Sequence, residues 1–437
     1  MKNSRNLLKF GFARAAVVFG LSIFCAFAVA SSSAQTLTTL ASFNSTNGAN
    51  PYFGPLVQGK NGSFYGTTFN GGANGQGSVF SVSPTGQLTT LYDFCPQTNC
   101  VDGANPEAGL ILASDGNFYG TTDGGGATGW GTVYSISPSG KFRSVYSFCA
   151  LSHCTDGSLP TSALVQGTDG SFYGTTFAGG GPLSDGTIFR ITPAGKLTTL
   201  YRFCSRQFGV VCLDGTMAYA GLVRGKDGNF YGTTYIGGNN DSGTIFRITP
   251  TGKFTTVYSF CPEGLPCVDG KNPSAPLTVA RNGDLYGTTV DGGAPLGGTI
   301  FRFSKGKLTN LYTLCSAANC TDGGLPFGGL VQGSDGNFYG TTQAGGSNRT
   351  CSGTCGTIFQ ITPTGSLSTL YNFCSEAGCS DGNWPYSTLV QGSDGKFYGA
   401  TYYGGSSSCF FGCGTVFSLS LGLAPEDPST LRDDEQH

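Results

Sequence analysis

A short phrase, FYGTT or a close variant, occurs seven times in this chain and constrains its fold more than any other feature. The tyrosines of the seven copies are 53 to 59 residues apart: Tyr65, Tyr119, Tyr173, Tyr231, Tyr286, Tyr339 and Tyr398. A fixed period of this length predicts one supersecondary unit that repeats and buries its apolar surface against neighbouring copies.

Each unit contains four phrases with the composition of strands. A short run such as GLVQG comes first, and an Asn-Gly or Asp-Gly pair joins it to FYGTT. A Gly-rich connection leads to GTIFRITP, and a Pro-x-Gly turn leads to KLTTLYRF. An Asx-Gly pair between apolar runs indicates a hairpin, and we expect a type I′ turn there. Four antiparallel strands at this period predict the blade of a β-propeller.

The two ends of the repeat region predict that the blades close into a ring. The fourth-strand phrase appears first as TLTTLASF (36–43), whereas GTVFSLS (414–420) has no fourth strand after it. If the N-terminal strand completes the last blade, no sheet edge is left exposed. We expect an all-β, seven-bladed β-propeller of four-stranded blades over residues 36–421. Within FYGTT, the Phe and Tyr side chains point to opposite faces and would pack on different neighbouring blades.

The first residues predict export. Basic residues up to Arg14 precede an apolar run and then small residues, which is typical of a signal peptide (1–30) cleaved after Ala30 or Ala34. An uncleaved anchor helix is the alternative. No later segment is long and apolar enough to span a membrane, and we expect residues 422–437 to be an acidic, disordered tail. The expected location is extracellular, at the cell surface or in the periplasm.

The cysteines agree with export. Cys25 lies in the leader, and the other sixteen of the 17 cysteines fall into close pairs. A locally paired, even set behind a signal peptide predicts disulfides, whereas a zinc site would need two pairs to converge. The predicted bonds are Cys95–Cys100, Cys149–Cys154, Cys204–Cys212, Cys261–Cys267, Cys315–Cys320, Cys351–Cys355, Cys374–Cys379 and Cys409–Cys413.

The tandem phrases DGNFYGTTxxGG, GTIFxITPxG and LTTLYxF resemble the bacterial GloVer (Gloeobacter/Verrucomicrobia) repeats of "choice-of-anchor" surface proteins. The resemblance covers nearly all of residues 36–421. It implies export, often with a C-terminal anchoring segment, and it supplies no catalytic residues that can be carried over to this chain. The tail LGLAPEDPSTLRDDEQH departs from the family because it has no apolar anchor.

Variation between the repeats is concentrated on one face of the expected ring, where the cysteine loops and the connections between second and third strands would emerge. Stiff, varied loops suit a binding surface, or they resist proteolysis. Aromatic side chains there could stack on sugars or anchor a protein partner, or pack beneath the loops. The candidate ligand-binding residues are Trp130, Trp384, Tyr52, Phe53, Tyr386, Phe410 and Phe411, with Tyr219 and Phe327 nearby.

Several functions are disfavoured by composition. A formal net charge of −2 offers no surface for nucleic acid. With only His153 and His437, no Ser-His-Asp set or histidine metal site is expected. GCSDG (378–382) and GGGATG (124–129) match catalytic and dinucleotide strings, but neither lies between a strand and a helix. We expect no cofactor and a monomer.

The carboxylates keep a carbohydrate-active enzyme open as the main alternative function. An Asp-Gly follows six of the cysteine pairs, with the aspartates Asp102, Asp156, Asp214, Asp269, Asp322 and Asp381. We expect these aspartates to form turns. A calcium site is not expected, because each blade supplies only one of them and calcium needs several oxygen ligands close together. Glu107, Glu263 and Glu376 also fall on the loop face, in non-adjacent blades.

The sequence therefore predicts a non-catalytic binding propeller for a glycan or surface protein. The alternatives are a carbohydrate-active hydrolase or lyase and a structural envelope protein. An acidic pair at the mouth of the central channel would favour the enzyme, and solvent-facing Trp130 and Trp384 would favour binding.

Overall fold

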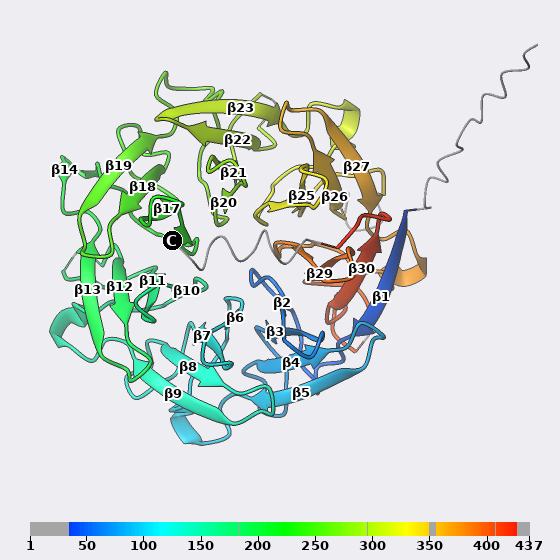
Figure 1. Ribbon diagram of the computed structural model, residues 1–437, viewed down its shortest axis with the longest axis horizontal. Coiled ribbons are helices and arrows are strands. Elements are labelled where there is room, and N and C mark those ends of the chain that lie inside the picture. Colours follow the sequence, from blue (N-terminus) through cyan, green and yellow to red (C-terminus); the bar gives the residue numbers. More distant parts are fainter. Residues whose placement is uncertain (1–34, 183, 295, 349–354, 407, 426–437) are drawn as a thin grey trace, which may run out of the picture. The chain divides into compact units, whose positions relative to one another are not determined.

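The computed structural model describes residues 35–425, except for residues 183, 295, 349–354 and 407. In these residues, seven four-stranded antiparallel sheets follow one another around a ring (Figure 1). The predicted seven-bladed β-propeller is confirmed. The predicted signal peptide and its two cleavage sites lie outside the described residues, as do residues 426–437 of the predicted tail. Within the described part, no helix is long and apolar enough to cross a membrane.

In each blade the four strands are arranged in chain order from the centre of the ring outward, and β1 takes the outermost place in the last blade (Figure 1). The innermost strands have two residues each: β2 (Val57–Gln58), β6 (Ile111–Leu112), β10 (Val165–Gln166), β16 (Val223–Arg224), β20 (Thr278–Val279), β24 (Val331–Gln332) and β28 (Val390–Gln391). The second strands are the FYGTT copies: β3 (Phe64–Thr68), β7 (Phe118–Thr122), β11 (Phe172–Thr176), β17 (Phe230–Thr234), β21 (Leu285–Thr289), β25 (Phe338–Thr342) and β29 (Phe397–Thr401).

The third strands correspond to the GTIF phrases: β4 (Ser78–Val82), β8 (Thr132–Ile136), β12 (Thr187–Ile191), β18 (Thr244–Ile248), β22 (Thr299–Ser304), β26 (Thr357–Ile361) and β30 (Thr415–Ser420). The outer strands are β5 (Leu88–Asp93), β9 (Phe142–Ser147), β13 (Leu197–Arg202), β19 (Phe254–Ser259), β23 (Lys307–Thr313), β27 (Leu367–Asn372) and β1 (Thr36–Ser42).

We number the blades by their innermost strands, so blade 1 begins with β2 and blade 7 with β28. Blade 7 is closed as predicted, because β1 pairs with β30 from Thr36↔Ser420 to Ser42↔Thr415. The cysteine loops hold short additional elements: the hairpin β14 (Gln207–Phe208) and β15 (Val211–Cys212), and the 3-10 helices η1 (Thr98–Cys100), η2 (Ser152–Cys154), η3 (Ala318–Cys320) and η4 (Ala377–Cys379).

The Asx-Gly hairpins are present, but the predicted type I′ turn is wrong. In blade 1 the N–H of Gly62 donates to the carbonyl of Gly59, and the N–H of Gly59 donates to the carbonyl of Ser63. Gly62 has a positive φ, whereas Asn61 does not. This is a three-residue connection with a Gly bulge. It is favoured because the Asn61 side chain accepts from the N–H of Ser63, which needs Asn61 outside the left-handed region.

The seams between blades explain why FYGTT repeats. At six of the seven junctions, the Tyr of one blade stacks on the Phe of the next with ring centroids 3.8 to 4.2 Å apart. The tyrosines in these six stacks are at most 2% exposed. The predicted alternation of Phe and Tyr between two neighbouring blades is therefore confirmed at these junctions, and aromatic stacking adds to the burial of apolar area.

The cysteine pairs form the predicted disulfides. Seven of the eight bonds are present among the described residues: Cys95–Cys100, Cys149–Cys154, Cys204–Cys212, Cys261–Cys267, Cys315–Cys320, Cys374–Cys379 and Cys409–Cys413. The predicted partner of Cys355, Cys351, lies outside the described residues. Each bond closes a local loop, so it stiffens that loop more than it links blades.

Candidate ligand site at the channel mouth

The cysteine loops and the connections between second and third strands meet on one face, which we call the loop face. In each blade an isolated bridge joins the two connections, for example Ala104↔Gly124 and Ser158↔Ala178. Near each bridge is a non-glycine residue whose φ lies between 52° and 59°: Asn50, Asn105, Leu159, Met217, Asn272, Leu325 and Trp384. This region is sparsely populated by non-glycine residues and is maintained only where the surroundings enforce it.

Backbone hydrogen bonds on both sides enforce this conformation. In blade 3, the N–H of Leu159 donates to the carbonyl of Trp130 in blade 2, and its own carbonyl accepts from the N–H of Phe177. The same pair of bonds recurs in the other blades. Where the residue is Asn, its side-chain amide also donates to the preceding blade, as Asn105 does to the carbonyl of Phe69 at 3.1 Å. The backbone around the channel is thus fixed blade by blade.

Two positions in each blade lie next to this frame and form two rings of residues. The first ring follows the residue with positive φ by two positions and consists of Tyr52, Glu107, Thr161, Tyr219, Ser274, Phe327 and Tyr386. The second ring directly follows the FYGTT strand and consists of Phe69, Asp123, Phe177, Tyr235, Val290, Gln343 and Tyr402. Both rings vary between blades, although the backbone that positions them repeats.

Residues from blades 1 to 6 line one cavity of about 160 Å³, which places it at the central channel. Its lining includes the first-ring side chains of Thr161, Tyr219, Ser274 and Phe327, together with Phe53. The hydroxyls of Thr161 and Ser274 are buried and have no hydrogen-bond partner in the structure. Buried polar groups are normally paired, so two unpaired hydroxyls among the residues that line one cavity favour a polar ligand there.

One side of the mouth is aromatic. The ring of Tyr52 lies 5.2 Å from Tyr386 and 5.1 Å from Tyr402, between centroids. Phe327 lies 5.3 Å from Tyr386, and Phe53 lies 3.9 Å from Tyr52. Blades 6, 7 and 1 therefore contribute one continuous group of partly exposed rings. Such a group combines apolar faces with phenol hydroxyls, which suits sugars and aromatic partners.

The other side of the mouth is acidic. Burial and, to a smaller extent, the negative charge of Asp123 together raise the pKa of Glu107 to about 8. Burial also raises the pKa of Asp123. The pKa of Tyr52 and of Tyr219 is raised, first by burial and then by the charge of Glu107. Glu107 is therefore mostly protonated at neutral pH and can donate a hydrogen bond beside the aromatic group.

The sequence candidates fall into three groups. Tyr52, Phe53 and Tyr386 belong to the mouth, and Trp384 contacts it, with centroids 6.4 Å from Tyr386 and 5.2 Å from Tyr403. Phe410 and Phe411 are 92% and 58% exposed and form an outer pair that reaches Tyr403 through Phe411. Trp130, in the β7–β8 connection of blade 2, is 47% exposed.

Sequence reasoning missed Thr161, Ser274, Asp123 and Tyr402. The glutamates lie in separate blades, as predicted, but the second carboxylate near Glu107 is Asp123 of the same blade, whose charge contributes to the raised pKa of Glu107. The aligned repeats carry a signal for these residues: the position that follows the proline in six of the seven copies and the position after FYGTT both differ from copy to copy.

The Asp-Gly aspartates, which the sequence predicts to form turns, accept hydrogen bonds that close the cysteine loops onto the outer strands. Asp156 accepts from the hydroxyl of Tyr146 at 2.8 Å and from the N–H of Ala150 at 2.9 Å. The other five also accept from an outer-strand tyrosine and a loop N–H. One acidic and cysteine group, Asp185 with Cys204 and Cys212, is compact enough for a metal, but its two sulfurs are already joined in a disulfide.

A ring of seven disulfide-stiffened blades built from one repeat defines the class as a tandem-repeat β-propeller. The model of the Gloeobacter/Verrucomicrobia repeat matches residues 25–211 and 207–417, and the chain belongs to this family. No curated protein matches the chain.

Among solved structures, the chain is similar to the extracellular domain of a protein described as a hybrid two-component system of B. thetaiotaomicron, with a TM-score of 0.54 and 12% identity. The match covers 88% of this chain and 40% of that one. A protein from Bacteroides uniformis described as a 6-phosphogluconolactonase matches with a TM-score of 0.49 and 16% identity, over 78% and 89% of the two chains. At 12% identity, the likeness to the extracellular domain shows the fold alone.

Proposed function

We propose that this protein is an exported binding propeller that holds a glycan at the channel mouth. The observation that carries the proposal is the cavity whose lining combines Tyr219 and Phe327 with Thr161 and Ser274, two residues whose buried hydroxyls have no partner. Sugars present apolar faces and many hydroxyls, so they match stacked rings beside unpaired hydroxyls. The rigid backbone around the mouth lowers the entropy lost on binding.

Calorimetry with a panel of neutral and acidic oligosaccharides tests the proposal. We expect one glycan to bind saturably and Tyr386→Ala to weaken that binding at least about tenfold, because it removes a ring at the centre of the aromatic side. Phe410→Ala is the matched control, since Phe410 is an exposed aromatic outside the mouth. Loss of binding in Phe410→Ala but not in Tyr386→Ala would move the site to the outer rim.

A second candidate, a carbohydrate-active hydrolase or lyase, is favoured by Glu107 and Asp123. A protonated carboxyl with a raised pKa beside a second carboxyl is the arrangement that general acid catalysis of glycoside cleavage requires. The test is release of reducing ends from the bound glycan. Cleavage that is lost in Glu107→Gln while binding persists would assign the enzyme, and intact glycan after prolonged incubation would leave binding alone.

Export is part of the proposal and is supported by the disulfides, which persist in oxidising compartments outside the cytoplasm. We expect the mature chain to begin at Ser31 or Gln35, according to the cleavage site used. Mass spectrometry of the protein recovered from culture medium and from cell fractions would locate it. An intact leader in membrane fractions would instead support the anchor helix.

A further inference from the structure

The junction between blades 4 and 5 differs from the other six in its core contact. Tyr231 of blade 4 faces Leu285 of blade 5, where every other junction has a Phe beneath the Tyr. Tyr231 is only partly buried, in contrast to the six stacked tyrosines. An aromatic ring is missing from this seam, and the face of Tyr231 is left without the partner that the other blades supply.

A shorter turn opens the same junction from outside. Between Ile191 and Leu197 of blade 3 there are five residues, whereas between Phe303 and Leu308 of blade 5 there are four. In the five Pro-x-Gly turns, the Gly lies so close to the preceding blade that an added Cβ would be 2.5 to 3.1 Å from an outer-strand carbonyl oxygen. At Gly306, apart from its two chain neighbours, no atom lies within 4 Å of the place that an added Cβ would take. The turn of blade 5 therefore does not cover blade 4.

A third difference lies deeper in the seam. At five of the other six junctions the first threonine of the FYGTT strand donates to the next blade, as Thr121 does to the carbonyl of Ser162 at 3.1 Å and Thr341 to the carbonyl of Ser387 at 3.1 Å. Blade 7 has Ala400 at this position. The hydroxyl of Thr233 in blade 4 is buried and has no partner. All three differences fall on one junction, which is packed less tightly than its counterparts.

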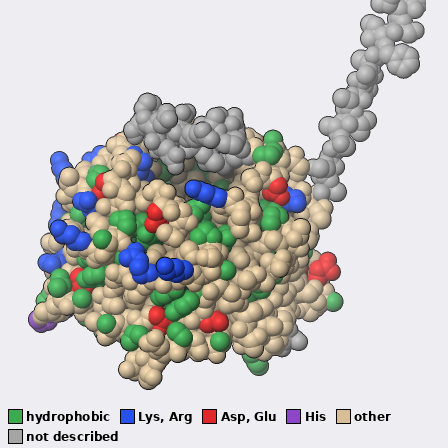
Figure 2. Space-filling view, turned by 60° about the horizontal axis from the view of Figure 1, so that its bottom comes forward, with side chains coloured by type: hydrophobic (Ala, Val, Ile, Leu, Met, Phe, Trp, Pro, Cys, Tyr) green, Lys and Arg blue, Asp and Glu red, His purple; other side chains and the backbone are tan. Residues whose placement is uncertain are grey.

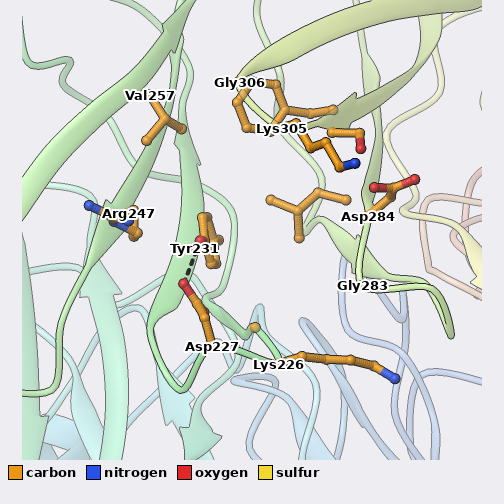
Figure 3. A pocket seen from close by; sticks show the side chains of 13 residues that line it. Lys226, Asp227, Tyr231, Arg247, Val257, Gly283, Asp284, Lys305 and Gly306 are labelled. Atoms are coloured by element: carbon orange, nitrogen blue, oxygen red, sulfur yellow. Dashed lines mark hydrogen bonds between the residues drawn. The ribbon is translucent and has the colours of Figure 1, made fainter.

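The result is a cleft of about 380 Å³ between the two blades (Figure 3). Tyr231 and Val257 line it from blade 4, and Leu285 and Phe303 line it from blade 5. For comparison, a cavity of roughly 150 Å³ in an engineered lysozyme accommodates benzene. The cleft lies at the turns between first and second and between third and fourth strands, and therefore on the face opposite the channel mouth.

Its charged side chains are predominantly cationic. Lys226, Arg247 and Lys305 line the cleft together with Asp227 and Asp284. Both carboxylates have partners: Asp284 pairs with Arg302 at 3.0 Å, and Asp227 accepts from the hydroxyl of Tyr231 at 2.9 Å and from the side chain of Asn229 at 2.7 Å.

The cations differ in their partners. The Nε of Arg247 is buried without a hydrogen-bond partner, although the Arg247 side chain hydrogen-bonds Tyr231 and interacts with the charge of Asp227. The equivalent Arg190 in blade 3 donates through Nε to Ser171 and pairs with Asp169. Lys226 donates to a backbone carbonyl, that of Arg281. Many of the Lys and Arg side chains visible in Figure 2 lie in the left half of the view, where Figure 1 has blades 3 and 4.

We propose that this cleft binds an aromatic carboxylate. Its ring would stack on Tyr231 beside Leu285, where the other junctions place a Phe, and its carboxylate would pair with Lys305. The stack would reproduce the contact of the six other junctions, and the charge pairing would be strengthened by the partial burial of the cleft. Two sources share this chemistry: a free aromatic acid and the C-terminal aromatic residue of a peptide.

Ligand-detected NMR with phenylacetate tests the proposal. We expect saturable binding, with benzyl alcohol at least about tenfold weaker because it lacks the carboxylate. Leu285→Phe fills the ring position and should abolish binding while the thermal midpoint is unchanged or higher. Lys305→Ala should weaken binding about tenfold, and Lys196→Ala, an exposed lysine of a blade 3 turn, should not. A second closing variant replaces residues 304–306 with the Thr-Pro-Ala-Gly of residues 192–195.

The outcomes decide the proposal. Absence of saturable binding, or equal binding by the unmodified protein and folded Leu285→Phe, would overturn it. If N-acetyl-phenylalanine binds more tightly than phenylacetate, the source is a peptide C-terminus, and the reverse order assigns a free acid. Because the cleft and the channel mouth lie on opposite faces, Leu285→Phe should leave glycan binding intact, so failure here does not bear on the proposed function.

Discussion

The seams between blades and the first ring at the channel mouth come from the same repeat, yet they differ in one respect. Six seams contain the same Tyr–Phe stack, with centroids 3.8 to 4.2 Å apart. The first ring contains five residue types in seven positions, although each position has the same backbone support. Identical side chains in a repeat indicate a shared packing role, whereas different side chains on an identical frame indicate that the side chains themselves are used.

The largest expected effect separates the two regions directly. Tyr173→Ala removes a buried stack and should lower the free energy of unfolding by about 3–5 kcal/mol. Tyr386→Ala removes a partly exposed ring and should cost clearly less, roughly 1–2 kcal/mol. Chemical denaturation of both variants measures the difference. Equal losses would mean that the first ring is packing as well, and the comparison would fail.

The next effect concerns Glu107 and depends on pH. Its pKa is raised in the folded protein to about 8 from the ordinary value of 4.5, so the folded state holds the proton more tightly than the unfolded state. The stability from this group is fully present below about pH 4.5 and is lost as pH rises through about 8, a change of a few kcal/mol in order of magnitude.

Glu107→Gln should remove this dependence, because the amide cannot ionise. Between about pH 5 and about pH 9, the free energy of unfolding measured by denaturation should therefore fall less in the variant than in the unmodified protein. A loss of the same size in both would place the titrating group elsewhere. Asp284→Asn, a change at the opposite face, controls for removal of one carboxylate in general.

A smaller effect sharpens the contrast between loops and seams. Replacing Cys149 and Cys154 together by Ser should lower the free energy of unfolding by about 2 kcal/mol, because the closed loop has about six residues. The seams of blades 2 and 3 should stay intact, which near-ultraviolet circular dichroism of the aromatic residues reports. Loss of that signal would show that the loop disulfide also supports blade packing.

The smallest effect tests the frame of the first ring. Leu159→Asn should raise the free energy of unfolding by roughly 1 kcal/mol, because Asn tolerates a positive φ better than Leu. Its amide could also donate to the preceding blade, as those of Asn50 and Asn105 do. Asn105→Leu is the reciprocal change and should be destabilising. If both changes leave the thermal midpoint unaltered, the left-handed position is not strained.

Most of the fold could be predicted from the sequence, because FYGTT, the strand phrases and the split blade are local patterns that repeat. The disulfides followed from spacing for the same reason. The predicted type I′ turn is wrong, because the side-chain oxygen of Asn61 accepts a hydrogen bond from the N–H of Ser63 within the turn. This local bond has a larger effect than the usual preference of Asx-Gly for type I′. The meeting of Tyr52, Tyr386 and Phe327 could not be seen in one repeat, because it depends on how seven blades close around an axis.

The central claim is that the varied first ring binds a ligand, and Trp384 provides the most direct measurement. Its ring contacts Tyr386 and Tyr403 at the mouth. In Trp130→Phe protein, Trp384 is the only tryptophan, and its emission can be followed during titration with the glycan panel. We predict a saturable change with one glycan that disappears in Tyr386→Ala and persists in Phe410→Ala. Emission that stays constant while the same glycan binds by calorimetry would place the ligand away from the mouth and contradict the claim.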